Sequence, residues 1–260
     1  MCLIALAWRA HPRYELALIA NRDEFHERPA APAGHDPTYP GVYGGRDLLQ
    51  GGSWLMASSH RRLAAVTNVR DGLPVATAPH SRGALVRGFV AATESNEEFL
   101  AELESSAHDH GHFNLIVWDG DSLAFASNHP HYATRAIAPG VHAMSNGAFD
   151  APWPKSGHAT RALSAWLASP AALRDDDAAL APLFDALADT TPAPDAALPD
   201  TGVGLELERV LSPAFVRGER YGTRCSSVVL VGASSIRFVE RRFGPGAKFE
   251  GETATVLPSP

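Results

Sequence analysis

The chain has 260 residues, of which 45% are hydrophobic and 20% charged, as in ordinary globular proteins. Its formal net charge is −7 and its basic residues form no long runs, which argues against a nucleic-acid partner. Leu3–Trp8 is apolar, but no basic region precedes it and Arg9 follows it, so we expect neither a signal peptide nor a membrane span. Two cysteines, Cys2 and Cys225, provide no disulfide framework and indicate a reducing compartment, the cytoplasm.

Strands are predicted in the first part of the chain. Apolar runs at Cys2–Trp8 and Glu15–Ala20 flank a short polar turn and predict a hairpin. In that hairpin, residues near position 20 lie opposite residues near position 2. Residues 26–52 are rich in Gly and Pro with little periodicity, which predicts a loop. Trp54–Ser58 and Leu63–Asn68 predict the next pair of strands.

Helices are predicted in the middle of the chain, and strands return at its end. Ser81 is expected to cap one helix and Asn96 a second, shorter one. The remaining expected elements are, in chain order, strands at Phe113–Trp118, Leu123–Ser127 and Val141–Ser145, amphipathic helices around 159–167 and 180–187, a loop at Thr190–Thr201, and strands at Ser226–Gly232 and Ser235–Arg241. This order is not an alternating β-α-β pattern, so it favours an α+β fold of mostly antiparallel sheets covered by helices. We expect one domain over residues 1–245 and a C-terminal tail over 246–260.

Cys2 is the first candidate for chemistry. If Met1 is removed, Cys2 carries a thiol and an α-amine on one residue. The thiolate is a nucleophile, and the amine, with an ordinary pKa of about 8, can act as its base. The alternative is that Cys2 is a small hydrophobic residue in a core strand.

Polar residues at the ends of the predicted strands complete a possible site. The hairpin places Arg22 and Asp23 beside Cys2, where Arg22 would favour the thiolate and Asp23 would hold the α-ammonium; the alternative is a surface ion pair. Asn68 and Asn146 end two other strands and either donate to an oxyanion or stabilise turns. Arg224 opens a strand after Tyr221-Gly222-Thr223. There it would clamp a carboxylate or stabilise the site, or else extend along the surface to solvent.

A set of short motifs makes the chain similar to a known family. They are Met1-Cys2, Asn21-Arg22-Asp23-Glu24-Phe25, Asp47-Leu48 with Gly51-Gly52-Ser53-Trp54-Leu55, Ala65-Val66-Thr67-Asn68-Val69-Arg70, Ser145-Asn146-Gly147 and Tyr221-Gly222-Thr223-Arg224. With these motifs the chain resembles the NRDE family, also called the transport and Golgi organisation 2 family, over residues 1–240. That resemblance implies a fold like that of the N-terminal-nucleophile hydrolases, a four-layer αββα sandwich.

The resemblance also implies a chemistry, because the choloylglycine hydrolases and penicillin V acylases are similar to this family. Those enzymes cleave amide bonds with an N-terminal cysteine, assisted by an Arg, an Asp, two Asn and a second Arg. By resemblance these roles fall to Cys2, Arg22, Asp23, Asn68, Asn146 and Arg224. The implied substrate is a small acyl compound with an amide or (thio)ester bond, and no metal or organic cofactor is required.

A second hypothesis is not enzymatic. Members of the resembled family have been linked to haem trafficking and to acyl-CoA or lipid handling, so the same cleft would bind and deliver a hydrophobic ligand. Candidate axial ligands for haem are Cys2, Cys225, Tyr221 and several histidines. Two histidine patterns, His108-x-His110-x-His112 and His129-Pro-His131, are compatible with metal binding, but alternate histidines in loops usually face solvent. The sequence leaves the oligomeric state and the ligand open.

Overall fold

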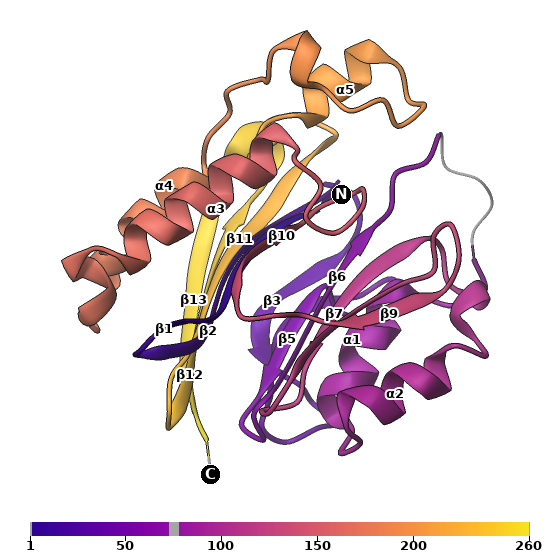
Figure 1. The fold of residues 1–260 in the computed structure, drawn as a ribbon. Coiled ribbons are helices and arrows are strands. Elements are labelled where there is room, and N and C mark those ends of the chain that lie inside the picture. The colour runs from indigo at the N-terminus through magenta and orange to yellow at the C-terminus, as the bar shows by residue number, and fades with distance from the viewer. Residues whose placement is uncertain (1, 73–77, 260) are drawn as a thin grey trace.

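The computed structural model describes residues 2–72 and 78–259, and its strands form two antiparallel sheets (Figure 1). The first sheet contains, in spatial order, β10 (Gly140–Met144), β1 (Cys2–His11), β2 (Tyr14–Phe25), β11 (Tyr221–Val231), β12 (Ser235–Phe243) and β13 (Phe249–Pro258). The second contains β3 (Ala30–His35), β4 (Val42–Asp47), β5 (Leu55–Ser58), β6 (Arg62–Asn68), β7 (Phe113–Trp118), β8 (Leu123–Ser127) and β9 (Ala133–Ala136). Met1, whose removal is expected, lies outside the described residues.

Helices cover the outer face of each sheet. In Figure 1, α3 (Pro154–Leu167) and α4 (Ala181–Leu187) lie on the first sheet, and α1 (Arg82–Ala91) and α2 (Asn96–Leu103) lie on the second. The short helix α5 (Leu205–Leu211) lies beyond one end of the first sheet. Among residues 2–72 and 78–259, no helix has the length and apolar character that crossing a membrane requires.

Three apolar cores separate these layers. Strand β1 contributes to two of them, because its successive side chains point to opposite faces of the sheet. Leu3 and Ala5 pack with Leu163 of α3, whereas Ile4 and Leu6 lie in the core between the two sheets. The third core joins the outer face of the second sheet to α1 and α2. A strand buried on both faces reads as a continuous apolar run, and the resulting order of layers confirms the expected αββα sandwich.

Ser81 and Asn96 were expected to cap the first two helices, and the structure confirms Ser81 alone. The Ser81 side chain accepts a hydrogen bond from the backbone N–H of Gly83 and caps α1. The cap of α2 is Ser95, so the prediction of Asn96 was wrong by one residue. Ser95 and Glu98 form a reciprocal capping box, which satisfies two backbone donors at once.

The prediction of a loop over residues 26–52 was wrong, because β3 and β4 lie within it. Glycines obscure β4 in the sequence. A side chain at Gly44 would collide with the backbone of Leu55, and one at Gly45 would collide with the Trp54 ring. These glycines are therefore strand residues that allow close approach of a neighbour.

The prediction of a C-terminal tail over 246–260 was also wrong. Residues Phe249–Pro258 form β13, which pairs with β12 from Phe243↔Phe249 to Ser235↔Pro258. In this edge strand only alternate positions are covered, all of them partly except the buried Leu257, and its sequence carries no long apolar run. The sequence analysis also missed β9 and α5. Strand β9 is exposed along its whole length and so has no buried apolar positions, and α5 has only seven residues, too few to show a helical period.

Candidate functional site

The hairpin of β1 and β2 positions the first three candidate residues. Cys2 lies opposite Arg22 in the register of the two strands, which confirms the expected pairing of positions near 2 and 20. The backbone N–H of Asp23 donates a hydrogen bond to the Cys2 thiol, and Cys2 as a whole residue is half-buried. Burial raises the pKa of Cys2, whereas the Arg22 guanidinium and the Asp23 N–H act in the opposite direction. The arrangement therefore offers the thiolate a cation and a hydrogen-bond donor.

Asp23 is a buried carboxylate held by the neighbouring strand. The hydroxyl of Thr223 donates to its Oδ1 atom at 2.6 Å, and Tyr221 Oη donates to its backbone carbonyl oxygen at 3.2 Å. Burial raises the pKa of Asp23, and the Lys155 ammonium and the Thr223 hydrogen bond oppose that rise. The carboxylate is thus fixed in position at the end of the sheet where Cys2 begins.

Arg22 is almost fully buried, and its guanidinium stacks on Trp54. The guanidinium carbon lies 4.1 Å from the centre of the indole ring. Its Nη1 group has no hydrogen-bond partner among the residues that the structure describes. A buried donor without a partner is unusual, and this one lies beside the strand position of Cys2.

Asn68, the last residue of β6, and Asn146, two residues after β10, meet through their side chains. Asn146 Nδ2 donates to the backbone oxygen of Asn68 at 2.9 Å and to Asn68 Oδ1 at 3.0 Å. This fixes the Asn68 amide and leaves its Nδ2 group as the donor end. Ser145, next to Asn146, donates from Oγ to the backbone oxygen of Cys2 at 2.9 Å. The pair is therefore connected to the strand end that carries the thiol.

Arg224 lies within β11, which begins at Tyr221, three residues before the expected start of the strand at Arg224. It occupies an irregularity in the pairing of β11 with β2, between Thr223 and Cys225. A bulge of this kind redirects a side chain, and the Arg224 guanidinium donates to the backbone oxygens of Phe25 and Arg28 at 2.9 and 3.0 Å. The structure gives Arg224 a role in bracing the chain that follows β2. The other five candidates lie around the beginning of β1.

Sequence reasoning missed Lys155, the buried lysine of this region. It is 4% exposed and donates from Nζ to the backbone oxygen of Leu211 at 3.2 Å. Burial lowers its pKa to about 8, with the charges of Asp23 and Cys2 acting in the opposite direction. The sequence contained a signal for a buried lysine. Lys155 is one of two lysines in the chain, and it lies on the same apolar helix face as Ala159 and Leu163.

Lys155 leads to a prediction about the pH dependence of stability. Its folded pKa of about 8 lies below its ordinary value of 10.5, so between these values the unfolded state binds the extra proton. The free energy of unfolding should therefore rise with pH across this window in the wild type, by up to about 3 kcal/mol relative to Lys155→Met. Urea unfolding of both proteins at pH 7.5 and pH 10 measures this difference. An equal change in the free energy of unfolding between the two pH values in both proteins would contradict the prediction.

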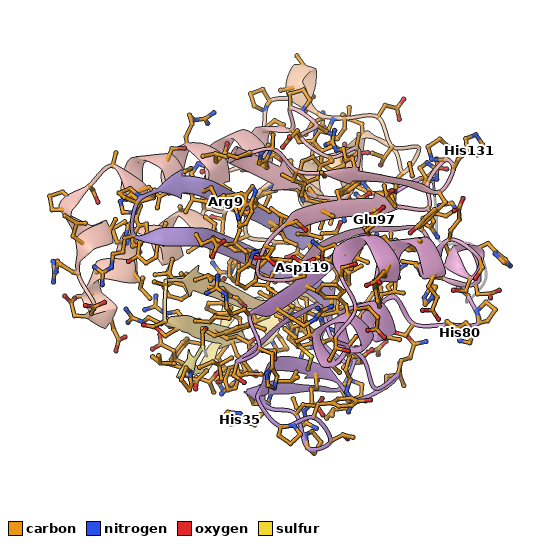
Figure 2. All side chains as sticks on the ribbon, turned by 60° about the horizontal axis from the view of Figure 1, so that its bottom comes forward. Arg9, His35, His80, Glu97, Asp119 and His131 are labelled. Atoms are coloured by element: carbon orange, nitrogen blue, oxygen red, sulfur yellow. The ribbon has the colours of Figure 1, made fainter. Side chains whose placement is uncertain are left out.

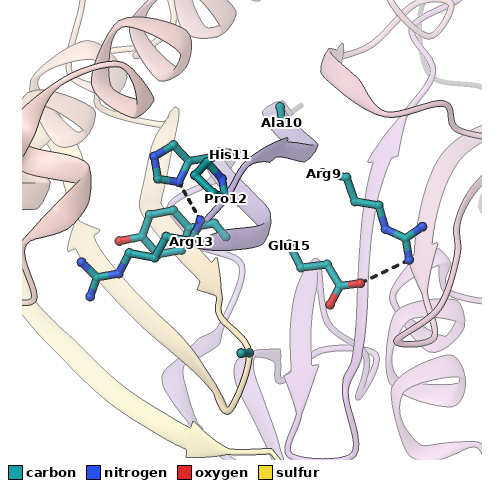
Figure 3. Close-up of a pocket in the computed structure, with 8 residues that line it drawn as sticks. Arg9, Ala10, His11, Pro12, Arg13 and Glu15 are labelled. Carbon is teal, nitrogen blue, oxygen red and sulfur yellow. Dashed lines mark hydrogen bonds and ion pairs between the residues drawn. The ribbon is translucent and has the colours of Figure 1, made fainter.

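A hollow on the surface lies away from these residues (Figure 3). It has a volume of about 570 Å³ and is formed by the turn between β1 and β2, including His11, Arg13 and Glu15. Cys2 is at the opposite end of β1. Arg9 and Arg61 both pair with Glu15 beside the hollow, and Arg13 pairs with Asp175.

Two other haem-ligand candidates, Cys225 and Tyr221, are engaged with protein groups. Cys225 is buried and forms a hydrogen bond with Glu240. Its burial raises the pKa of its thiol, and the Glu240 charge raises it further. Tyr221 donates to the Asp23 carbonyl oxygen, and burial raises the pKa of its phenol.

Comparisons with known proteins agree with this fold. The model of the family described as Transport and Golgi organisation 2 matches residues 1–245. The chain is 30% identical over 275 residues to the Transport and Golgi organization protein 2 homolog of Bos taurus, covering 98% of each chain. It is 30% identical over 258 residues to the homolog of Homo sapiens, covering 93% of this chain and 92% of that protein.

Solved structures share the fold at low sequence identity. The mutant C2A conjugated bile acid hydrolase from Clostridium perfringens superposes with a TM-score of 0.53 at 8% identity, covering 97% of this chain and 92% of that chain. This likeness shows that the chain shares its fold with that hydrolase, in agreement with the expected αββα sandwich. Together with the family match over residues 1–245 and the 30% identity to curated relatives, the findings show that the chain belongs to the Transport and Golgi organisation 2 family.

Proposed function

We propose that the protein is a cysteine N-terminal-nucleophile hydrolase that cleaves an amide or (thio)ester bond in a small acyl compound. The observation that carries the proposal is the register of β1 and β2. It places Cys2 opposite the buried Arg22 guanidinium, with the N–H of Asp23 on the thiol. A hydrolase of conjugated bile acids with the same fold supports the reaction class.

The proposed reaction has two steps. Removal of Met1 exposes the α-amine of Cys2, which takes the thiol proton while Sγ attacks the carbonyl carbon. The carbonyl oxygen becomes an oxyanion, which accepts hydrogen bonds from Asn68 Nδ2 and a backbone N–H. Each such donor is worth about 3–4 kcal/mol. The bond to the leaving group then breaks, and the α-ammonium returns its proton to that group.

Water completes the reaction. It attacks the thioester on Cys2, releases the acyl group as a carboxylic acid and regenerates the thiol. Asp23 orients the α-ammonium throughout, and Asn146 positions Asn68. Neither step requires a metal or an organic cofactor. Both cysteines are free thiols, and a reactive thiol persists in a reducing compartment, so the proposal places the protein in the cytoplasm.

The test is the intact mass of the untagged protein before and after treatment with p-nitrophenyl butyrate, an activated acyl ester. The expected result is loss of Met1 and one butyryl group, mapped to Cys2 by peptide mass spectrometry. Cys2→Ala should abolish this label, whereas Cys225→Ala should retain it, because Cys225 is buried.

Retention of Met1, or labelling that survives Cys2→Ala, would overturn the proposal. The carrier hypothesis would then gain support. Its own test is reconstitution with haem, where a Soret band that shifts on replacement of an axial ligand indicates binding.

A further inference from the structure

Three side chains from separate parts of the chain converge at one edge of the second sheet. They are Asp71, His112 and His129, and one ligand atom from each lies within 4.8 Å of the others. The His112 and His129 rings are 4.5 Å apart between centroids, and His129 Nε2 lies 3.8 Å from Asp71 Oδ2. The cluster is separate from the site around Cys2, and the proposed hydrolysis does not use it.

The topology of the sheet explains this convergence. Strands β6, β7 and β8 are consecutive antiparallel neighbours, so the end of β6, the start of β7 and the end of β8 meet at one edge. His112 directly precedes β7, His129 follows β8 by two residues, and Asp71 follows β6 by three. Each of the three neighbouring strands therefore supplies one side chain to the cluster.

Backbone hydrogen bonds hold these three chain segments together. The N–H of Val69 donates to the carbonyl oxygen of His112 at 3.0 Å, which continues the pairing of β6 and β7. Asn128, next to His129, accepts from the N–H of Phe113 at 2.8 Å and donates to the carbonyl oxygen of His110 at 3.2 Å. The ligand-bearing residues are thus mounted on a braced sheet edge, while the side chains of Asp71 and His112 remain exposed.

We propose that Asp71, His112 and His129 bind a divalent transition-metal ion, with Zn²⁺ as the reference ion. Two imidazoles and one carboxylate suit Zn²⁺ and leave a fourth position for water. With metal–ligand distances near 2.0–2.1 Å, tetrahedral ligand atoms lie roughly 3.3 Å apart. The present spacing requires only a modest closure, which rotation of partly exposed side chains provides.

The set takes one histidine from each of the two patterns in the sequence. The other members have different surroundings: His110 is buried with Nδ1 3.1 Å from the Ser81 carbonyl oxygen, and His108 is exposed beside Asp109. His131 is exposed at the periphery of the molecule (Figure 2). His108 and His131 are therefore matched controls, because each belongs to the same local pattern as a proposed ligand.

A bound ion would also tie down the segment that follows Asn68. In that segment the N–H of Arg70 donates to the carbonyl oxygen of Asn146 at 2.7 Å, and the N–H of Gly72 donates to that of Thr201. Binding to the folded state raises its stability by mass action. The melting temperature should therefore rise with Zn²⁺ concentration only when the three ligands are intact.

The experiment is isothermal titration calorimetry of chelator-treated full-length protein with Zn²⁺, together with Co²⁺ absorption spectroscopy. All variants carry Cys2→Ala as well, since a thiolate also binds Zn²⁺. One ion per chain is expected. Replacing even the outer partner of a metal ligand weakens binding by about 10–100-fold, so His112→Ala, His129→Ala and Asp71→Asn should each weaken it by about 100-fold.

The control variants His108→Ala and His131→Ala should retain wild-type affinity and the Zn²⁺-dependent rise in melting temperature. No measurable binding to the parent protein would overturn the proposal. So would an equal loss in the control variants, because that pattern indicates diffuse binding to surface histidines. Failure of the acyl-labelling experiment has no bearing on this outcome, since the two sites share no residue.

Discussion

Replacing Asn68 by alanine is expected to slow acylation of Cys2 by about 100- to 1,000-fold. The reason is geometric. Asn146 holds Asn68 Oδ1 and directs the amide so that Nδ2 is its donor end, and the proposed oxyanion accepts from that group. The measurement is the rate of butyrylation by p-nitrophenyl butyrate under single-turnover conditions, followed by intact mass.

A second reagent separates catalysis from damage to the fold. Iodoacetamide alkylates a thiolate without forming an oxyanion, so Asn68→Ala should leave the rate of Cys2 alkylation nearly unchanged. Asn146→Ala should slow acylation less than Asn68→Ala, because Asn146 positions the donor and does not itself bind the oxyanion. A parallel fall in both acylation and alkylation of Asn68→Ala would argue that Asn68 supports the structure only.

Replacing Glu208 by glutamine is expected to lower the free energy of unfolding by about 3 kcal/mol. Glu208 and Arg70 form an ion pair at 2.7 Å, with their side chains only 3% and 6% exposed. Glu208 also accepts from the N–H and hydroxyl of Thr201 at 2.9 and 2.5 Å. Glutamine has nearly the same shape but leaves the buried Arg70 charge without its carboxylate, and burial already lowers the pKa of Arg70.

Helix α5 contains its own control for this prediction. Glu206 pairs with Arg209 on the same helix, where the two side chains are 87% and 38% exposed. Exposed pairs contribute little to stability, so Glu206→Gln should unfold at nearly the wild-type urea concentration. Similar midpoints for the Glu206 and Glu208 variants would contradict the assigned role of the buried pair.

Much of the arrangement around Cys2 was predictable because it depends on a single hairpin. The short turn between the first two strands sets their register, and a register assigns every residue a partner. Arg22 and Asp23 therefore belong beside Cys2 on sequence grounds, and the order of strands and helices indicates the layered α+β fold. Four strands escaped prediction: β3, β4, β9 and β13. In β4 and β13, glycines or polar residues replace an apolar run.

The other contacts depend on how separate layers pack. Asn68 ends β6 of the second sheet, and Asn146, 78 positions later, follows β10 of the first. Glu208 reaches Arg70 from a helix that no periodicity revealed. His112 and His129 meet because the start of β7 and the end of β8 are neighbours in the sheet. The other histidines of the two sequence patterns lie outside this cluster. The sequence by itself determined the hairpin and its candidate nucleophile, since short-range pairing follows from local pattern. Only the tertiary structure decided which distant strand ends meet, because burial of apolar surface between layers sets those distances and leaves no local signal.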